Sequence, residues 1–325
     1  MKPFDSFLAP QLNEYLAYRR SMGYSIKVSR EHLLVFDRYL RQTNAQWDAL
    51  TPFYFLEMRA HLDMETRSVN RVSSSVRVFF HFLLRREYVR DNPLRDIPPL
   101  KENRIIPFVF SPDQTEQLIQ AACKRVQGSK RGSFLKDIAI YLAMVLLARY
   151  AMKISEPLKL MKHHYRRDEA TLYIEKTKFK KQRLIPVPKS AIQELENYLS
   201  VRRSLQPHDH NPYLLAGKTH GPLNAEQIRY LFRNAVKEIG LDQERRVIGN
   251  VNFSRPSPHS LRHSFAVNTL MKIKQRGASP QHALPVLAAY MGHSEYKYTS
   301  VYLRVTDALS RNQLVEFALW QKRKE

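Results

Sequence analysis

The sequence predicts a mainly α protein with a small β-hairpin or sheet, divided into an N-terminal helical unit and a C-terminal α+β domain. Three observations lead to this fold class. Apolar residues recur at helical spacing through the first 95 residues, five prolines fall between residues 93 and 112, and two short β-rich runs follow at 171–178 and 182–188. With 325 residues, the chain is long enough to bury two hydrophobic cores.

The N-terminal unit, residues 1–95, is predicted to contain four or five helices. Helical periodicity runs through residues 7–24, 28–42, 53–62 and 69–89. Turn-forming residues separate these segments: Gly23, Asn44 and the pair Asp91-Asn92 before Pro93. No segment of this unit alternates as a strand would, so we expect a purely helical core.

Residues 96–111 are predicted to be a proline-rich linker to a second domain at 112–325. Ser111 has the character of an N-cap, with Pro112 at the first position of a helix. The next helix contains the apolar run from Ile138 to Ala148, which is shorter than the roughly 18–20 residues that a membrane span needs. We therefore expect a buried core helix there. Further helices are predicted at 189–203, 224–239, 259–275, 280–291 and 308–321.

The charge balance is strongly basic, and it indicates a polyanionic partner. Lys and Arg number 53 against 30 Asp and Glu, which gives a net charge of +23. Nucleic acid is the usual partner of such a chain, and double-stranded DNA is our prediction. The single cysteine, Cys123, excludes an internal disulfide and a cysteine-rich zinc module. With no signal peptide and no membrane span in the sequence, we expect a soluble, cytoplasmic protein that does not bind a membrane.

The segment PSPHSLRHSFAVNTL, residues 256–270, could carry catalytic side chains. His259, Arg262 and His263 stand at positions i, i+3 and i+4, on one face of a predicted helix. A solvated basic face is an equally good interpretation of these residues in isolation. A zinc site is a weaker one, because the glutamate of an HExxH motif is absent and no third ligand is indicated nearby.

A second segment, LAAYMGHSEYKYTSVYLRV at 287–305, combines a turn with a nucleophile candidate. Gly292 suits a helix end, His293 follows it, and Tyr302 comes nine residues later. Composition alone does not distinguish Tyr302 from three neighbouring tyrosines, or from a half-buried tyrosine with a bonded hydroxyl. The other three are Tyr290, Tyr296 and Tyr298.

Taken together, these segments closely resemble the tyrosine recombinase family, the phage-integrase and chromosome-resolvase type. That family has an HxxR helix, a GH turn and a tyrosine nine residues later, which match His259, Arg262, His293 and Tyr302. TKFKKQRLIPVP resembles the family's β-hairpin, whose lysine would be Lys178. YAMKISEPLKL resembles the stretch in which an arginine is followed three residues later by an acid. Here the acid is Glu156, but the arginine position holds Lys153.

The resemblance implies a fold and a reaction. The N-terminal unit would be a helical, SAM-like core-binding domain, and the second domain the tyrosine-recombinase catalytic domain. Tyr302 would attack a DNA phosphate to form a 3′-phosphotyrosyl bond, so the chain would be a site-specific recombinase of the integrase or transposase type. Arg262, His259, His293 and Lys153 would stabilise charge or handle protons, and Lys178 would be the acid for the leaving oxygen. No cofactor and no metal would be needed.

Other basic residues are expected to bind DNA rather than to catalyse. Lys180, Lys181 and Arg183 near the hairpin tip would contact phosphates, or would simply form a solvated charge run. In the 67–86 helix, Arg67, Arg71 and Arg77 could enter a major groove or contact phosphates. The C-terminal helix would dock on a neighbouring protomer in a homotetramer on two DNA sites, or in a hetero-assembly with another recombinase, although docking on its own domain is the alternative.

Lys153 is the departure from the family pattern that affects the expected activity. Lysine offers one compact charge where arginine offers a rigid two-pronged donor. Three interpretations follow: a slow but active recombinase, one that needs a partner recombinase, or an impaired homologue that acts as a DNA-binding accessory subunit. A type IB topoisomerase would share the chemistry, but the two-domain size and short linker fit a recombinase better.

Overall fold

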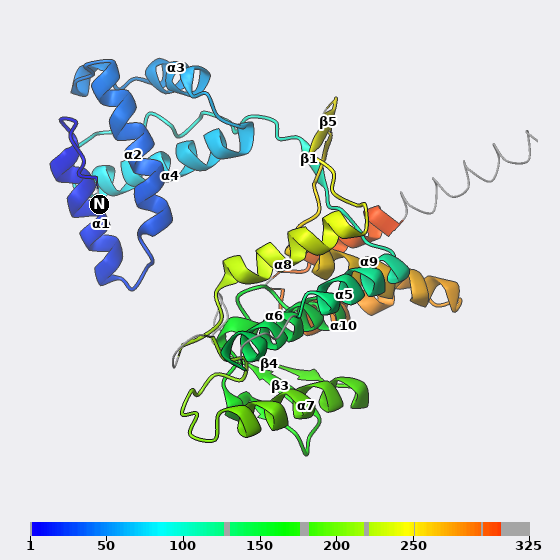
Figure 1. Ribbon diagram of the computed structural model, residues 1–325. Coiled ribbons are helices and arrows are strands. Elements are labelled where there is room, and N and C mark those ends of the chain that lie inside the picture. Colours follow the sequence, from blue (N-terminus) through cyan, green and yellow to red (C-terminus); the bar gives the residue numbers. More distant parts are fainter. Residues whose placement is uncertain are drawn as a thin grey trace, which may run out of the picture. The chain divides into compact units, whose positions relative to one another are not determined.

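The computed structural model describes residues 2–126, 131–175, 182–217, 221–249, 251–293 and 295–306. They form two compact units, 1–104 and 105–325, each with a core of its own (Figure 1). The mainly helical fold with small sheets that the sequence predicts is confirmed. None of the helices in the described part of the chain is long and apolar enough to cross a membrane.

The first unit is a bundle of helices around an aromatic core. Phe36, Phe55 and Phe80 are fully buried, and their rings meet at tilted or edge-on angles with centroids 5.3–6.3 Å apart. Buried Asp37 accepts hydrogen bonds from the backbone and side chain of Ser6, which fixes the N-terminal segment on the bundle. The elements are α1 (Ala9–Ser21), α2 (Lys27–Gln42), the 3₁₀ turn η1 (Trp47–Ala49), α3 (Pro52–His61) and α4 (Thr66–Arg85).

The second unit is built around one apolar helix, α6 (Arg131–Tyr150). It packs against α5 (Pro112–Lys124), α7 (Lys189–Leu205), α8 (Ala225–Glu238) and α9 (Pro258–Gln275), so that apolar residues on all its sides are buried (Figure 1). The capping box of Ser111 and Gln114 starts α5, as the sequence indicates. The apolar run from Ile138 to Ala148 is therefore at the centre of the core.

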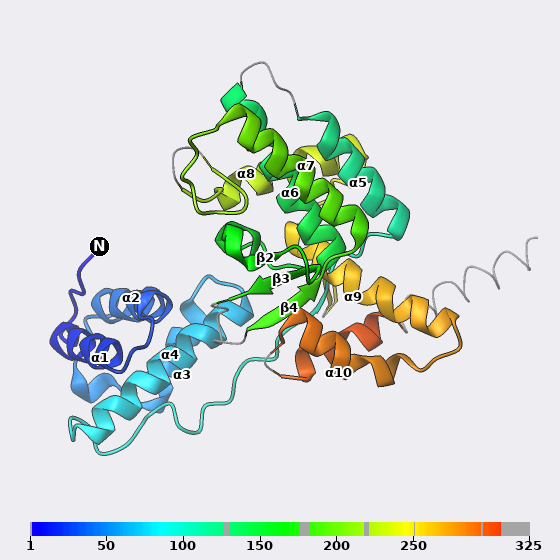
Figure 2. The ribbon, with the colours of Figure 1, turned by 90° about the horizontal axis from the view of Figure 1, so that it is seen from below.

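The predicted hairpin is present and belongs to a three-stranded sheet. Strand β3 (Thr171–Ile174) pairs antiparallel with β4 (Arg183–Pro186), with Leu172 opposite Ile185, and β2 (Tyr165–Arg166) adds at the other edge of β3. Both Leu172 and Ile185 are buried in the core. Strand β4 also contacts α10 (Pro280–Met291), so that the hairpin lies beside the end of that helix (Figure 2).

A second small sheet was not predicted. Its strands are β1 (Arg104–Ile106), β5 (Arg246–Ile248) and β6 (Val251–Phe253), in the order β1-β6-β5. Three-residue strands are too short to show alternation in the sequence, which explains the omission. The remaining elements are the 3₁₀ turns η2 (Pro157–Lys159) and η3 (Lys162–His164) and a helical segment at 297–306. The helix predicted at 308–321 lies outside the described residues.

Candidate active site

Helix α9 carries the HxxR motif, and its start is fixed by its own sequence. The backbone N–H of Ser257 donates to Ser260 Oγ at 3.1 Å, the N–H of Ser260 donates to the Ser257 carbonyl at 2.8 Å, and Pro258 begins the first turn. One turn later, Ser264 Oγ accepts a hydrogen bond from the N–H of Phe110 at 2.8 Å. The helix that presents two histidines and an arginine is therefore anchored at its N-terminal end.

Arg262 lies at the centre of the site and joins three parts of the chain. Its guanidinium donates to the carbonyl of Ala151, just after α6, and to the carbonyl of Met291, at the end of α10. Only 1% of the residue is exposed, and burial lowers its pKa to about 10 despite the opposing charge of Glu156. It remains a cation at neutral pH. Since a guanidinium has five N–H groups, these two bonds fix its orientation and leave donors for a phosphate.

The turn after α6 places Lys153 beside this arginine. The helix ends at Tyr150, and Ala151 adopts a left-handed backbone with φ of +52°. The N–H of Lys153 then donates to a Glu156 carboxylate oxygen at 2.8 Å, and the N–H of Glu156 donates to the Lys153 carbonyl at 2.8 Å. This tight turn fixes the backbone from which the Lys153 side chain projects.

Arg183 does not have the role that the sequence suggested for it. We expected a phosphate contact near the hairpin tip, but its guanidinium forms a two-pronged ion pair with Glu156, at 2.8 and 3.0 Å. The side chains are 8% and 6% exposed, respectively. Because both ends of the fork are engaged with a buried carboxylate, Arg183 is an internal residue of the site. It ties strand β4 to the turn that holds Lys153.

The GH turn packs against the same arginine. Gly292 ends α10 with φ of +64°, a conformation that glycine adopts without strain. A Cβ atom there would lie 3.0 Å from Arg183 Nη1, so the turn also needs glycine for space. His293 follows, and its Nδ1 is hydrogen-bonded to Thr299 Oγ1 at 2.7 Å. Thr299 is buried in the helical segment 297–306, which connects the turn to Tyr302.

Tyr302 is the tyrosine whose hydroxyl the structure brings to a histidine of α9. It is 3% exposed, its hydroxyl is hydrogen-bonded to Nδ1 of His263 at 3.0 Å, and its ring lies nearly parallel to that of His293. Burial raises its pKa to about 12, and the charge of Arg262 acts in the opposite direction. The other candidates differ: Tyr290 stacks on Phe265, while Tyr296 and Tyr298 are exposed.

The histidines of the site are neutral at physiological pH. Burial lowers the pKa of His263 to about 3 and that of His293 to about 4. His259 is an exposed residue, yet nearby protein atoms desolvate its imidazole and lower its pKa as well. The charge of Lys153 contributes to the lowered pKa of both His259 and His293.

His263, which the sequence suggested only as part of the basic face of this helix or as a weak zinc ligand, is a further residue of the site. It stacks edge-on against His259, with ring centroids 4.5 Å apart, and reaches the hydroxyl of Tyr302. Its i+4 spacing from His259 was the signal that could have found it. Among the described residues, no group of three or more His, Cys, Asp and Glu side chains is arranged to hold a metal ion.

Several predicted residues lie elsewhere. Lys178, Lys180 and Lys181 fall outside the described residues. In the first unit, Arg77 donates to the carbonyls of Leu94 and Ile97 at 2.9 and 2.6 Å, and Arg67 pairs with Glu102 at 2.8 Å. These contacts hold the end of the unit together, and DNA binding by the two arginines stays a prediction. Arg71, by contrast, is exposed on α4.

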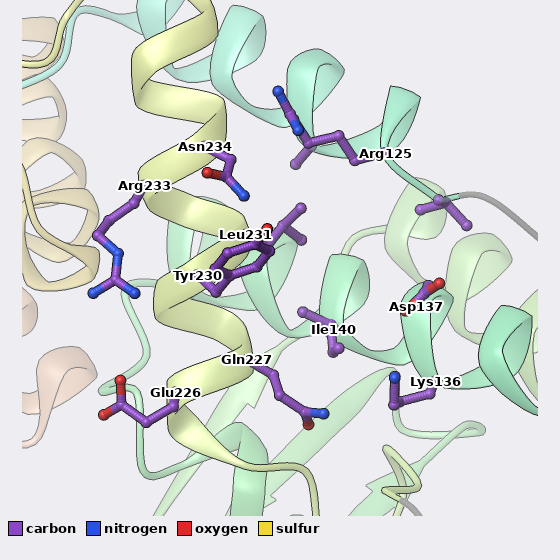
Figure 3. Close-up of a pocket in the computed structure, with 12 residues that line it drawn as sticks. Arg125, Lys136, Asp137, Ile140, Glu226, Gln227, Tyr230, Leu231, Arg233 and Asn234 are labelled. Atoms are coloured by element: carbon purple, nitrogen blue, oxygen red, sulfur yellow. The ribbon is translucent and has the colours of Figure 1, made fainter.

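One pocket of the second unit lies away from this cluster. A hollow of about 570 Å³ lies between α8 on one side and α5 and α6 on the other, and Tyr230 of α8 lines it (Figure 3). None of the predicted catalytic residues contributes to its walls. The chemistry is therefore assigned from the side-chain cluster and not from this pocket.

Comparison with known proteins places this geometry in context. The profile of the phage integrase family matches residues 109–308, a range that includes Lys153, Arg262 and Tyr302. Tyrosine recombinase XerC of Alcanivorax borkumensis is 27% identical over 259 residues, which cover 79% of this chain and 76% of that protein. A putative integrase/recombinase of Sinorhizobium fredii is 28% identical over 314 residues, 93% of each chain. A similar fold is found in the XerH site-specific recombinase, whose structure was solved as a post-cleavage complex with a palindromic difH substrate. The TM-score is 0.69 at 17% identity, and the match covers 96% of this chain and 84% of that one.

Proposed function

The chain belongs to the phage integrase family and is a site-specific DNA recombinase of the tyrosine type, and on this basis we propose that Tyr302 is its nucleophile. The observation that carries the proposal is the position of the Tyr302 hydroxyl. Tyr302 and Arg262 are buried, and three histidines from α9 and the GH turn, His259, His263 and His293, lie around them.

The proposed reaction exchanges one phosphodiester for another. The phenolic oxygen of Tyr302 attacks a backbone phosphate, forms a 3′-phosphotyrosyl bond and releases a 5′-hydroxyl. A 5′-hydroxyl from a partner duplex then attacks the same phosphorus and releases the tyrosine. Because each step replaces one phosphate ester bond with another, no nucleotide cofactor is needed to drive it.

Arg262 and Lys153 meet the electrostatic demand of this reaction. Negative charge develops on the non-bridging oxygens of the phosphate, and fixed donors aimed at these oxygens lower the barrier. Arg262 is held by two backbone carbonyls before DNA binds, so its reorganisation cost is small. Lys153 supplies a second cation from the Glu156 turn. His259 and His293 add imidazole donors on the same side.

The buried state of Tyr302 adds a requirement. A phosphate must come within bonding distance of a hydroxyl on a residue that is 3% exposed, so the segments that cover it must shift when DNA binds. In the free protein the nucleophile is shielded, with its proton in place at a pKa of about 12. Cleavage would then begin only on a correctly seated duplex.

We further propose a tetramer on two double-stranded DNA sites, in the cytoplasm. Exchange of strands needs two duplexes and one nucleophile for each cleaved strand, which makes four. The net charge of +23 supports DNA as the partner, and a single cysteine suits a reducing compartment. Lys178, Lys180 and Lys181 remain the proposed hairpin contacts, with Lys178 as the acid for the leaving oxygen. Residues 112–325 would be the catalytic domain and 1–95 the core-binding domain.

A nicked suicide substrate tests the role of Tyr302. Duplexes from the regions that flank the encoding gene would carry a nick beside the cleavage position, so that a short fragment is lost and rejoining is blocked. A covalent adduct should form with the parent chain, persist in Tyr298→Phe and disappear in Tyr302→Phe with DNA affinity retained. An adduct that survives Tyr302→Phe contradicts the proposal.

The same assay separates the alternatives. Tight DNA binding without an adduct from the parent chain would support an accessory subunit, and an adduct that appears only when a second recombinase is added would support partner dependence. Relaxation of supercoiled DNA that carries no specific site would indicate a topoisomerase.

A further inference from the structure

The contact between His263 and Tyr302 has a chemical consequence beyond packing. The two residues are 39 positions apart, and Nδ1 of His263 lies 3.0 Å from the phenolic oxygen. That separation is within the range in which a proton moves directly between heavy atoms. Among the described residues, His263 is the side chain that forms a hydrogen bond with this hydroxyl.

We propose that His263 is the catalytic residue that accepts the phenolic proton of Tyr302 during strand cleavage and returns it during rejoining. The inference rests on the proposed role of Tyr302 as nucleophile. As the O–P bond forms, the O–H bond of Tyr302 breaks and its proton moves to Nδ1. The bond from phosphorus to the 5′-oxygen breaks at the same time, and that oxygen takes a proton from a separate acid. Rejoining reverses each transfer.

The neighbouring histidines are less suitable for this step. Nδ1 of His293 is engaged by Thr299 at 2.7 Å, and its ring lies nearly parallel to the tyrosine ring. His259 packs edge-on against His263, and in the part of the chain that the structure describes it is His263, not His259, that bonds the hydroxyl. His263 alone among the three therefore combines an available lone pair with the correct distance.

The electrostatic state of His263 fits a proton acceptor that becomes active only with DNA. Burial and three facing groups, His259, Arg262 and His293, lower its pKa to about 3, so the imidazole is neutral in the free protein. With its proton on Nε2, Nδ1 presents a lone pair to the hydroxyl. Tyr302 keeps its proton, since its own pKa is about 12.

Bound DNA makes transfer of the proton from Tyr302 to His263 more favourable in two ways. A phosphate anion beside the cluster favours the charged imidazolium and raises the pKa of His263. Attack on phosphorus withdraws electron density from the phenolic oxygen, so that its proton is held ever more weakly as the new bond forms. The proton is therefore transferred in the step that makes the O–P bond, and not before it.

Two substitutions separate proton acceptance from orientation. In His263→Asn, the amide oxygen can occupy the position of Nδ1 and accept the hydrogen bond, but it cannot take the proton. His263→Ala removes both functions. We expect single-turnover cleavage of the suicide substrate to fall by about 10²–10⁴ in both variants, with DNA affinity within about threefold of the parent. Far-UV circular dichroism and melting curves establish that each variant is folded.

Two further readouts report on the proton itself. Cleavage by His263→Asn should rise about tenfold per pH unit between pH 7 and 9, because hydroxide must remove the proton, whereas the parent profile should be flatter. Free imidazole should accelerate His263→Ala but neither His263→Asn nor Tyr302→Phe. A sulfur atom in place of the 5′-bridging oxygen, which needs no acid to leave, should not restore either His263 variant.

The outcomes are distinguishable. His263→Asn that cleaves within threefold of the parent, with an unchanged pH profile, would overturn proton acceptance while leaving Tyr302 as the nucleophile. Restoration by the bridging sulfur would also overturn it, because the residue would then serve the leaving group. An adduct that survives Tyr302→Phe would instead contradict the proposed function on which this inference rests.

Discussion

Replacing Glu156 with glutamine should destabilise the catalytic unit strongly, although Glu156 is not proposed to touch DNA. The substitution keeps the size of the side chain and removes its charge. Arg183 would then be left as a buried guanidinium without a counter-ion. Arg262 would be affected as well, because the charge of Glu156 favours its charged form and the charge of Arg183 disfavours it.

The magnitude follows from the burial of the pair. Side-chain exposures of 6% and 8% place both groups out of water, and removal of one partner from such a pair typically costs about 3–5 kcal/mol. Glu156 also accepts the backbone N–H of Lys153 at 2.8 Å, so the turn itself loses a charged acceptor. With an m value of about 2–3 kcal/mol per molar urea, the midpoint of unfolding should fall by about 1–2 M.

Urea denaturation with hydrogen exchange provides the measurement. Because the two units have separate cores, loss of exchange protection should appear in α6 and α9 and leave α2 and α4 unchanged. Glu169→Gln is the matched control. Its partner is Arg166, three residues earlier, at 3.0 Å but with exposed side chains, and it should cost less than about 1 kcal/mol.

A double variant tests the mechanism. In Glu156→Gln with Arg183→Met, no uncompensated charge remains, so much of the lost stability should return, with a coupling energy of about 2–3 kcal/mol. If Glu156→Gln alone costs less than about 1 kcal/mol, or if the two substitutions are simply additive, the ion pair is not what holds β4 to the turn.

Three further predictions concern the same cluster. Lys153→Arg should raise the cleavage rate, because a two-pronged donor replaces a single charge. Lys153→Ala should lower the rate by about 10²–10³ with little change in DNA affinity. A Lys153→Ala variant that cleaves as fast as the parent would exclude that lysine from the site. Gly292→Ala should lose more stability in thermal melting than Gly240→Ala, since both have positive φ, of +64° and +69°, but only the first would press a Cβ against another side chain. Finally, the pKa of His263 is about 3 in the folded protein and about 6.5 in the unfolded chain, so the unfolded chain binds the proton first as the pH falls. The contribution of neutral His263 to stability is therefore fully present above pH 6.5, and the free energy of unfolding should fall by about 2 kcal/mol between pH 6.5 and 5. Urea titrations at each pH measure this fall, and the slope should be shallower in His263→Asn.

The sequence by itself determined the elements and the order of the motifs. Helical periodicity and the Ser111-Pro112 cap are local properties, which depend on residues three or four positions apart. The apolar run from Ile138 to Ala148 was too short to span a membrane, and it proved to be the buried centre of the second unit. The spacing from His259 to Tyr302 is enough to indicate the family, which the match to the family profile confirms.

Only the tertiary structure decided which side chains act together. Arg183 pairs with a carboxylate 27 residues away, and Arg262 binds a carbonyl 111 residues away. His263 meets a hydroxyl 39 residues away, and neither end of that contact shows it in the sequence. Such pairings depend on the path that the chain takes between elements, and periodicity carries no information about that path. For this reason a basic residue at a hairpin became a buried counter-ion, and a histidine with no assigned role came to face the proposed nucleophile.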